Sequence, residues 1–292
     1  MVDFLKYRYF FLVLSIAVLG VGIFGYVKNN GFAYHIDFEG GSELRLKFEK
    51  VVDIAKVRSA VEHSGWSHAT IQTLGSTSDE FLVRIKSDEE GANIGERFKR
   101  KVSDKLSDHT FVVSSVDHVG PEAGKEVCWN AAKSIILALI ALLIYIAARF
   151  RFAYGLGAIV SLGHDLLAIL SFLLITKMAF SQHVLAAIIA LLGYSLNDTI
   201  IIFSKIRECA AKTPPASTQA AYDLVNYSLN KTLRRTLLTS FATFLSVTVL
   251  YLFGGEALEA FSLTMMIAIV VGTYSSIYIA SPVMLAVAGT KL

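Results

Sequence analysis

The sequence is poor in the residues that hold small secreted or metal-bound domains together. Its 292 residues include two cysteines, four prolines and two tryptophans. Cys128 and Cys209 are expected near opposite faces of a membrane, so neither a disulfide nor a metal site is predicted. The sequence also lacks a phosphate loop, a zinc-spaced His/Cys set and a nucleophile elbow. We therefore expect neither an enzyme nor a cofactor.

Charged residues are also scarce: they make up 17% of the chain, and the net charge is +3. So small an excess gives no global basic surface, and nucleic acid is not an expected partner. Apolar residues are abundant instead: 54% of the chain is hydrophobic and its mean hydropathy is +0.56. These values are typical of an integral membrane protein rather than of an ordinary water-soluble domain.

Six apolar runs are long enough to cross a membrane, which takes roughly 20 residues. They are approximately Tyr9–Val27, Ser134–Ala148, Phe152–Ile175, Val184–Phe203, Leu237–Phe253 and Phe261–Ala288. The first run is expected to remain as an uncleaved anchor, because no small-x-small cleavage site follows it. If the six spans alternate, most Lys and Arg residues outside the segment between the first two spans fall on one side, so both termini are predicted to be cytoplasmic.

The predicted organisation follows from these spans. It comprises a cytoplasmic N-terminus (1–8), a first span (9–27), a periplasmic domain (28–130), five further spans (131–289) and a cytoplasmic tail (290–292). A basic cytoplasmic loop is expected over 204–235. Within it, Tyr222, Val225 and Leu229 mark an amphipathic helix that we expect to lie along the inner membrane surface.

The periplasmic segment has its own secondary-structure pattern. Strands are expected at 43–48, 70–74, 81–85 and 110–119, and helices at 52–63 and 94–106. The order β-α-β-β-α-β is the split βαβ arrangement of a ferredoxin-like sandwich. The predicted fold class is thus a multi-pass α-helical membrane protein with a small α+β ferredoxin-like domain outside the cytoplasm.

Ionisable residues inside the spans are the candidate functional residues, because each costs about 2.5–3.5 kcal/mol to insert. The candidates are His164 and Asp165 in the third span, Asp198 in the fourth and Arg235 at the start of the fifth. Ser195, Asn197, Thr239 and Thr243 are the expected supporting polar groups. Asp198 beside a cation could take up and release a proton. The alternative is that these polar groups only hold neighbouring helices together.

Several motifs resemble the SecD/SecF family of the bacterial Sec protein-export machinery. They are His35-Ile-Asp-Phe-Glu-Gly-Gly-Ser42, Gly163-His-Asp165, Gly193-Tyr-Ser-Leu-Asn-Asp-Thr199, Ser228-Leu-Asn-Lys-Thr-Leu-Arg-Arg-Thr236 and Leu252-Phe-Gly-Gly-Glu-Ala-Leu258. Two departures stand out: Ser204-Lys205 replaces the family's Asp-Arg, and Glu39 replaces its usual Thr before Gly-Gly.

The resemblance implies one six-helix half of an RND-type membrane domain, paired with a SecD-like half and working with the SecYEG channel. YajC- or YidC-like proteins and the emerging unfolded polypeptide are further implied partners. It also implies that the proton motive force drives export, with Asp198 as the embedded acid and Arg235 as the neighbouring cation that tunes its protonation. Two alternatives remain: a non-conducting assembly scaffold of the translocase, and a half-size RND-type exporter of a small molecule or lipid.

Overall fold

The computed structural model describes residues 2–66, 69–74, 79–85, 94–106 and 109–292, and of Glu256 and Ala257 only the backbone. The chain divides into two compact units. One comprises residues 1–33 and 132–292 and contains the membrane-spanning helices; we call it the helical unit. The other comprises residues 34–131; we call it the outer domain.

The described residues contain six helical stretches that are long and apolar enough to cross a membrane. They are α1 (Arg8–Lys28, preceded by the 3-10 turn η1, Leu5–Tyr7), α5 (Pro121–Arg149), α6 (Phe152–Thr176), α7 (Gln182–Lys212), α8 (Thr218–Phe253), and α9 (Glu256–Ser275) continued by η2 (Ser276–Ala280) and α10 (Ser281–Ala288). The six predicted spans are thereby confirmed.

The helical unit is densest around α6, α7 and α9. About half of the most apolar window of each of these spans is buried, against 11% for α1 and α5 and 17% for α8. Glycines allow two of the close contacts. A Cβ on Gly157 of α6 would lie 2.6 Å from the carbonyl oxygen of Ala280, and one on Gly272 of α9 would lie 3.0 Å from the Cβ of Ser195. Both glycines are therefore packing requirements.

The predicted cytoplasmic loop over 204–235 is mostly helix. α7 continues to Lys212 and α8 begins at Thr218, so that residues 213–217 alone connect them. Pro214 and Pro215 are the only helix breakers in the segment, and the hydroxyl of Ser217 caps α8 by accepting from the backbone N–H of Ala220, at 3.2 Å.

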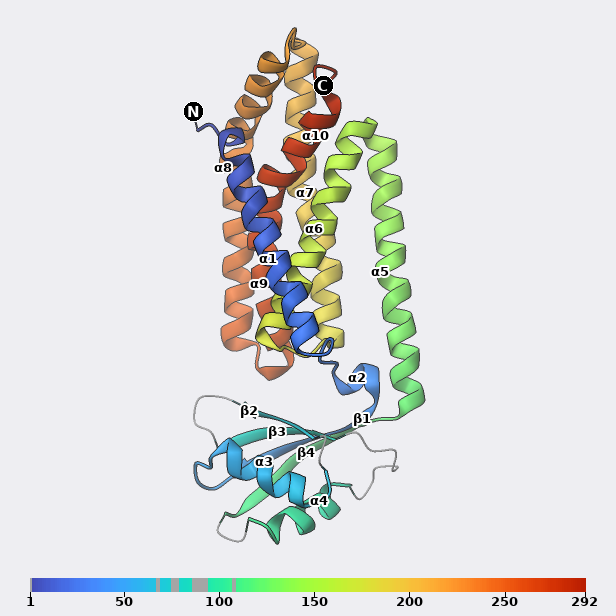
Figure 1. Cartoon of the computed structure of the whole chain (residues 1–292), viewed down its shortest axis with the longest axis vertical. Helices are drawn as coiled ribbons and strands as arrows, with labels where there is room; N and C mark the ends of the chain where they lie inside the picture. The colour runs from blue at the N-terminus through green and yellow to red at the C-terminus, as the bar shows by residue number, and fades with distance from the viewer. Residues whose placement is uncertain (1, 67–68, 75–78, 86–93, 107–108) are drawn as a thin grey trace. The chain divides into compact units, whose positions relative to one another are not determined.

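The predicted amphipathic surface helix is also wrong, because it is the first part of α8. Its apolar face packs on protein: Ala221, Val225 and Leu229 are buried in one cluster with Phe4 and Ile206. At 1.5 Å per residue, α8 is about 54 Å long, well beyond the ~30 Å of a hydrocarbon core. The α7–α8 hairpin reaches past the α5–α6 connection as a helical pair (Figure 1).

The outer domain has the predicted ferredoxin-like topology. Its sheet has the order β2-β3-β1-β4, and each described pairing is antiparallel. The elements are α2 (Ile36–Glu39), β1 (Gly41–Phe48), α3 (Ile54–His63), β2 (Thr70–Leu74), β3 (Glu80–Ile85), α4 (Ile94–Ser103) and β4 (Phe111–Val119). α2 was not predicted.

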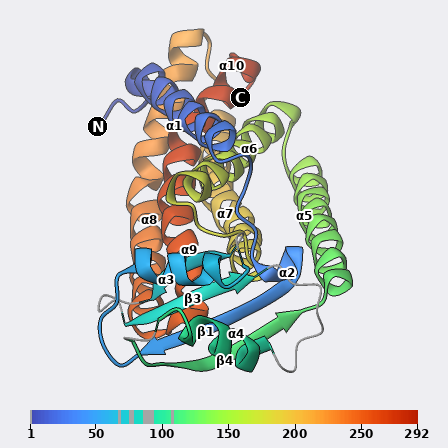
Figure 2. The ribbon, with the colours of Figure 1, turned by 60° about the horizontal axis from the view of Figure 1, so that its bottom comes forward.

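One face of the sheet forms the core of the outer domain, with α3 and α4 packed on it (Figure 2). Alternate residues of β1, Leu44, Leu46 and Phe48, point into this core together with Phe81 and Phe98. The opposite face is polar and carries the cross-strand pair Glu43 and Arg84. This alternation is the period-two pattern that predicted the strand.

Candidate functional site

The three predicted carboxyl and imidazole groups of the spans lie at the contacts of α6, α7 and α9. Asp165 and Asp198 are almost completely buried, at 0% and 1% exposure. Asp165 accepts a hydrogen bond of 2.5 Å from the hydroxyl of Ser195, and its other oxygen lies 3.2 Å from Nδ1 of His164. The GHD motif and the YSLND motif thus meet at this point.

Asp198 has a different environment. One of its oxygens accepts from the hydroxyl of Ser240 in α8 at 3.3 Å, and Ser240 also lies 2.7 Å from the hydroxyl of Thr273 in α9. The other oxygen is buried with no hydrogen-bond partner among the described residues, as is the hydroxyl of Thr236. A buried carboxylate oxygen without a donor costs free energy, so Asp198 differs from Asp165, whose two oxygens both have a neighbouring polar group.

Further hydroxyls connect the same helices. Ser161 donates to Ser275 at 3.0 Å, and the hydroxyls of Thr199 and Ser276 lie 2.9 Å apart. Ser276 also contacts the carbonyl of Ser195, at 3.5 Å. Four of the interhelical bonds in this region are therefore made by side chains at the end of α9 and the start of η2.

η2 is a five-residue π-helical segment. Such segments occur mostly as single-turn bulges within α-helices, frequently at functional sites. Here it separates α9 from α10 at the level of Thr199, and the hydroxyl of Ser281 donates to the carbonyl of Ser276 at 3.0 Å. The segment thus places Ser276 against α7 without breaking the span.

His164 connects this region to α1. Its ring packs on the ring of Tyr274 with centroids 5.8 Å apart. The hydroxyl of Tyr274 donates to the carbonyl of Phe11 at 2.7 Å and is in hydrogen-bond contact with Ser15. Tyr274 is thus hydrogen-bonded to α1 and packs on the His164 ring, and His164 in turn lies beside Asp165.

The remaining predicted residues are arranged differently. Arg235 is exposed, and no ion pair joins it to Asp198 in the described part of the chain. Asn197 is exposed on the face of α7 away from Asp198. Thr239 and Thr243 each donate to a carbonyl of their own helix, at 3.0 Å and 2.9 Å. Their hydroxyl stripe lies along the little-buried helix α8.

Sequence reasoning missed Ser240, Thr273, Ser161, Ser275, Ser276, Thr199 and Tyr274. Hydroxyl residues are common in spans, where they can bond to their own backbone, and nothing in the local sequence distinguishes those that bridge two helices. The triplet Tyr274-Ser-Ser276 within an apolar run was the one available signal.

The outer domain contains a separate charged cluster at the start of β1. His35 lies 3.1 Å from a carboxylate oxygen of Asp37 and 3.1 Å from one of Glu43, and Arg84 donates to Glu43 at 2.6 Å. Burial alone would lower the pKa of His35, but hydrogen bonds to Asp37 and Glu43 outweigh it and raise the pKa to about 9. The imidazolium therefore fixes α2 to the sheet.

This cluster makes the stability of the outer domain pH-dependent. Because the pKa of His35 rises from 6.5 in the unfolded chain to about 9, its contribution is complete below pH 6.5 and is lost as the pH rises through 9. We expect the thermal midpoint of the purified chain to fall between pH 7 and pH 10. His35→Gln should remove most of that dependence, while His63→Gln, on the surface of α3, should not. An equal dependence in all three proteins would contradict the assignment.

The fold and the site define a class of protein: a six-span membrane protein that buries carboxyl groups between its helices and carries a ferredoxin-like domain between its first two spans. Comparison with known proteins gives the family. The family model described as "Protein export membrane protein SecD/SecF, C-terminal" matches residues 99–290. The chain belongs to the SecD/SecF family, and its role is therefore in protein export rather than in enzyme catalysis.

Relatives match over nearly the whole chain. The protein translocase subunit SecF of Calditerrivibrio nitroreducens is 37% identical over 282 residues, which cover 96% of this chain and 92% of that protein. The subunit of the same name from Escherichia coli O157:H7 is 32% identical over 288 residues, covering 96% and 85%. The chain is accordingly a multi-pass protein of the inner membrane.

Two solved structures are also similar. The crystal structure of SecDF, a translocon-associated membrane protein from Thermus thermophilus, matches with a TM-score of 0.85 and 29% identity. A second SecDF structure, described as a super-membrane-facing form, matches with a TM-score of 0.65 and 31% identity. In both cases the match covers 98% of this chain and 38% of the SecDF chain. The chain thus spans well under half the length of these proteins.

Proposed function

We propose that the chain is one half of an RND-type membrane domain that pairs with a SecD-like subunit and uses the proton motive force to promote protein export. SecYEG is the channel it serves, and YajC- or YidC-like proteins are further partners in this proposal. The observation that carries it is Asp198, a carboxyl group buried between three helices with one oxygen unpartnered in the described part of the chain. The other oxygen accepts from Ser240, and a proton on the carboxyl group would add a hydrogen-bond donor at this position.

In the proposed mechanism, Asp198 is the group that changes protonation. Protonated, it becomes a donor as well as an acceptor; ionised, it needs a cation or further donors. Arg235 lies on the same helix as Ser240, five residues before it, and is the cation that we propose for the ionised state. Each state therefore favours a different packing of α7, α8 and α9. Asp165 and His164 provide a second carboxyl–imidazole pair that α1 contacts through Tyr274.

A proton that crosses the membrane field releases about 2.3 kcal/mol per 100 mV. This is comparable to the energy that separates two packings of a helix bundle, because a single interhelical polar contact is worth ~0.6–2 kcal/mol. The gradient is therefore sufficient to bias such a transition, and a pure scaffold would have no use for an ionisable group at this position.

The proposed orientation has both termini in the cytoplasm and the outer domain in the periplasm. It is supported by the helical unit, in which both termini and the α5–α6 and α7–α8 connections lie at one end (Figure 1). Basic residues concentrate at that end: Lys6, Arg8, Arg149, Arg151, Lys205, Arg207, Lys212, Lys231, Arg234, Arg235 and Lys291. Such an excess is typical of the cytoplasmic side.

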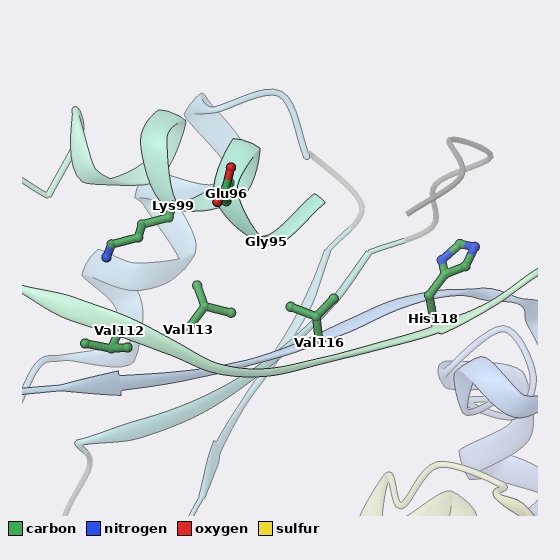
Figure 3. A pocket seen from close by; sticks show the side chains of 7 residues that line it. All are labelled: Gly95, Glu96, Lys99, Val112, Val113, Val116 and His118. Atoms are coloured by element: carbon green, nitrogen blue, oxygen red, sulfur yellow. The ribbon is translucent and has the colours of Figure 1, made fainter. Parts of the chain in front are cut away.

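We further propose that the outer domain holds emerging unfolded polypeptide at the edge of its sheet. β4 is an edge strand of nine residues, so one side of its backbone has no partner strand in the described ranges. Val112 and Val116 of β4 are 54% and 40% exposed. They line a groove of about 620 Å³ with Gly95 and Lys99 of α4 and His118 (Figure 3).

An edge strand beside a groove that combines three valines with Glu96, Lys99 and His118 suits an extended chain of varied sequence. The backbone hydrogen bonds are independent of sequence, and the groove accepts alternate apolar side chains. Gly95 keeps α4 close to this strand, since a Cβ there would lie 2.9 Å from Cγ2 of Val116. Weak, sequence-tolerant binding is what a device that holds and releases polypeptide requires.

The groove can be tested with aspartate substitutions. We expect Val112→Asp and Val116→Asp together to weaken binding of fluorescently labelled β-casein to the detergent-solubilised chain about tenfold, because two charges would replace the apolar contacts that the bound polypeptide covers. Val51→Asp is the control, since Val51 is 68% exposed and lies outside the groove. Anisotropy titrations measure the affinity. Equal affinities in all variants would exclude this surface.

Two experiments test the proposal as a whole. The first is affinity purification of the chain in mild detergent, which is expected to recover a second six-helix subunit of the SecD type together with channel subunits.

The second measures release of an exported protein into the periplasm of cells with and without the chain, before and after addition of an uncoupler. The proposal requires that the chain increases release and that the uncoupler removes the increase.

A further inference from the structure

Three arginines gather where α5 ends and α6 begins. Arg149 is the last residue of α5, Arg151 precedes α6, and Arg207 reaches them from α7, donating to the carbonyl of Arg149 at 3.2 Å. The guanidinium groups of Arg149 and Arg207 lie over the ring of Phe150, at 5.7 Å and 5.5 Å from its centroid. The cluster is therefore built around one aromatic ring.

No carboxylate neutralises this cluster in the described part of the chain. The nearest acid in sequence, Glu208, is occupied by Lys205 at 2.9 Å and Lys212 at 2.7 Å. The N-terminus of α6 adds to the positive potential, because Arg151 is its N-cap residue and provides no side-chain cap. Three fixed cations and an uncapped helix end favour an anion.

An apolar groove of about 300 Å³ begins at the same place. It lies between α5 and α6 and is lined by Leu143, Ile146, Ala147, Phe150, Arg151, Phe152, Gly155, Leu156 and Ile159. Arg151 is its only charged residue and Phe152 is 80% exposed. Gly155 contributes no side chain to the groove, where a Cβ would contact Cγ2 of Ile146 at 3.4 Å.

We propose that this groove and the three arginines bind one anionic phospholipid, with its phosphate at Arg149, Arg151 and Arg207 and an acyl chain along the groove. The occupant follows from the two chemistries side by side: a soluble anion has no use for the apolar groove, and a zwitterionic lipid has its phosphate charge balanced internally. Basic pockets between spans at a membrane surface are suited to such headgroups. The site is independent of the carboxyl groups between α6, α7 and α9.

Native mass spectrometry of the purified full chain tests the site with two probes, dioleoyl phosphatidylglycerol and dioleoyl phosphatidylcholine. We expect the first to bind more tightly. Each arginine should contribute about fivefold, which corresponds to ~1 kcal/mol. Arg149→Gln, Arg151→Gln and Arg207→Gln combined should remove the preference. Lys6→Gln, Lys231→Gln and Lys291→Gln combined remove the same charge elsewhere and should retain it.

A second pair of variants tests the groove. Gly155→Leu should lower occupancy by phosphatidylglycerol severalfold, whereas Gly163→Leu, on the same helix with nothing within 4 Å of its Cβ, should not. If the triple glutamine variant loses its thermal transition, the single variants Arg149→Gln, Arg151→Gln and Arg207→Gln replace it, each with an expected loss of about fivefold.

Three results would overturn the proposal. They are equal binding of both lipids by the parent chain, a preference unchanged in the triple glutamine variant, and complete displacement of the lipid by millimolar glycerol phosphate. The last would identify a site for soluble phosphate esters rather than for a membrane lipid.

Discussion

Asp198→Asn is expected to abolish the part of protein export that depends on the proton gradient while leaving the chain assembled in the membrane. Asparagine has nearly the same shape and can still accept from Ser240, which lies 3.3 Å from the carboxylate, but it cannot take up or release a proton. Export in cells carrying the variant should equal export by the parent in the presence of an uncoupler. Pulse-chase release of a secreted protein measures the difference.

The neighbouring residue provides a matched control. Asn197 is exposed on another face of α7, since successive residues of a helix point about 100° apart. The exchange variant Asp198→Asn/Asn197→Asp keeps the composition of the helix but moves the carboxyl group out of the contact with Ser240. It should be as inactive as Asp198→Asn. If either variant assembles normally and its export still responds to the uncoupler, the chain acts as a scaffold and Asp198 as a helix–helix contact.

Gly157→Leu is expected to destroy the packing of the helical unit. A Cβ on Gly157 would lie 2.6 Å from the carbonyl oxygen of Ala280 and 3.0 Å from the Cβ of Met284. Neither the backbone carbonyl nor the buried Met284 can move away cheaply, because both belong to the span that packs against α6. We expect a loss of at least about 3 kcal/mol in the free energy of unfolding, measured by thermal or denaturant unfolding in detergent micelles.

The same helix offers the control for this substitution. Gly163 is exposed, and a Cβ there would meet nothing within 4 Å. Gly163→Leu should change the free energy of unfolding by no more than about 0.5 kcal/mol. A similar loss in both variants would mean that the cost comes from the glycine-to-leucine change in the helix itself and not from the contact with Ala280.

The spans and the sheet could be predicted from the sequence because each has a local cause. Long apolar runs specify membrane helices, and the alternation of Glu43 to Phe48 specifies a strand with one buried face. The extended α7–α8 hairpin could not be predicted in this way. Its basic, amphipathic sequence fits a helix on a lipid surface as well as a helix against protein, and only the packing of Val225 and Leu229 on Phe4 decides between them.

The candidate site was predicted where the residue type itself is costly in a membrane. Asp165, Asp198 and His164 were identified for this reason. Ser240 and Thr273 were not, because a hydroxyl in a span is inexpensive and its partner depends on tertiary contacts. The short helix α2 was not predicted because four residues are too few to show a helical periodicity. Its ends are marked by His35 at the N-cap and by Gly40, whose φ is 73°.

The π-helical segment η2 sets the orientation of everything that follows it. It holds one residue more than the corresponding α-helical turn, so the residues of α10 are rotated by about 100° from the positions that an uninterrupted α-helix would give them. In this orientation Met284 and Leu285 are buried. Deleting one residue between Ser276 and Ala280 would restore the α-helical hydrogen-bond pattern and turn these two side chains toward lipid. Most single substitutions in α10 would not change the rotation of the helix about its axis.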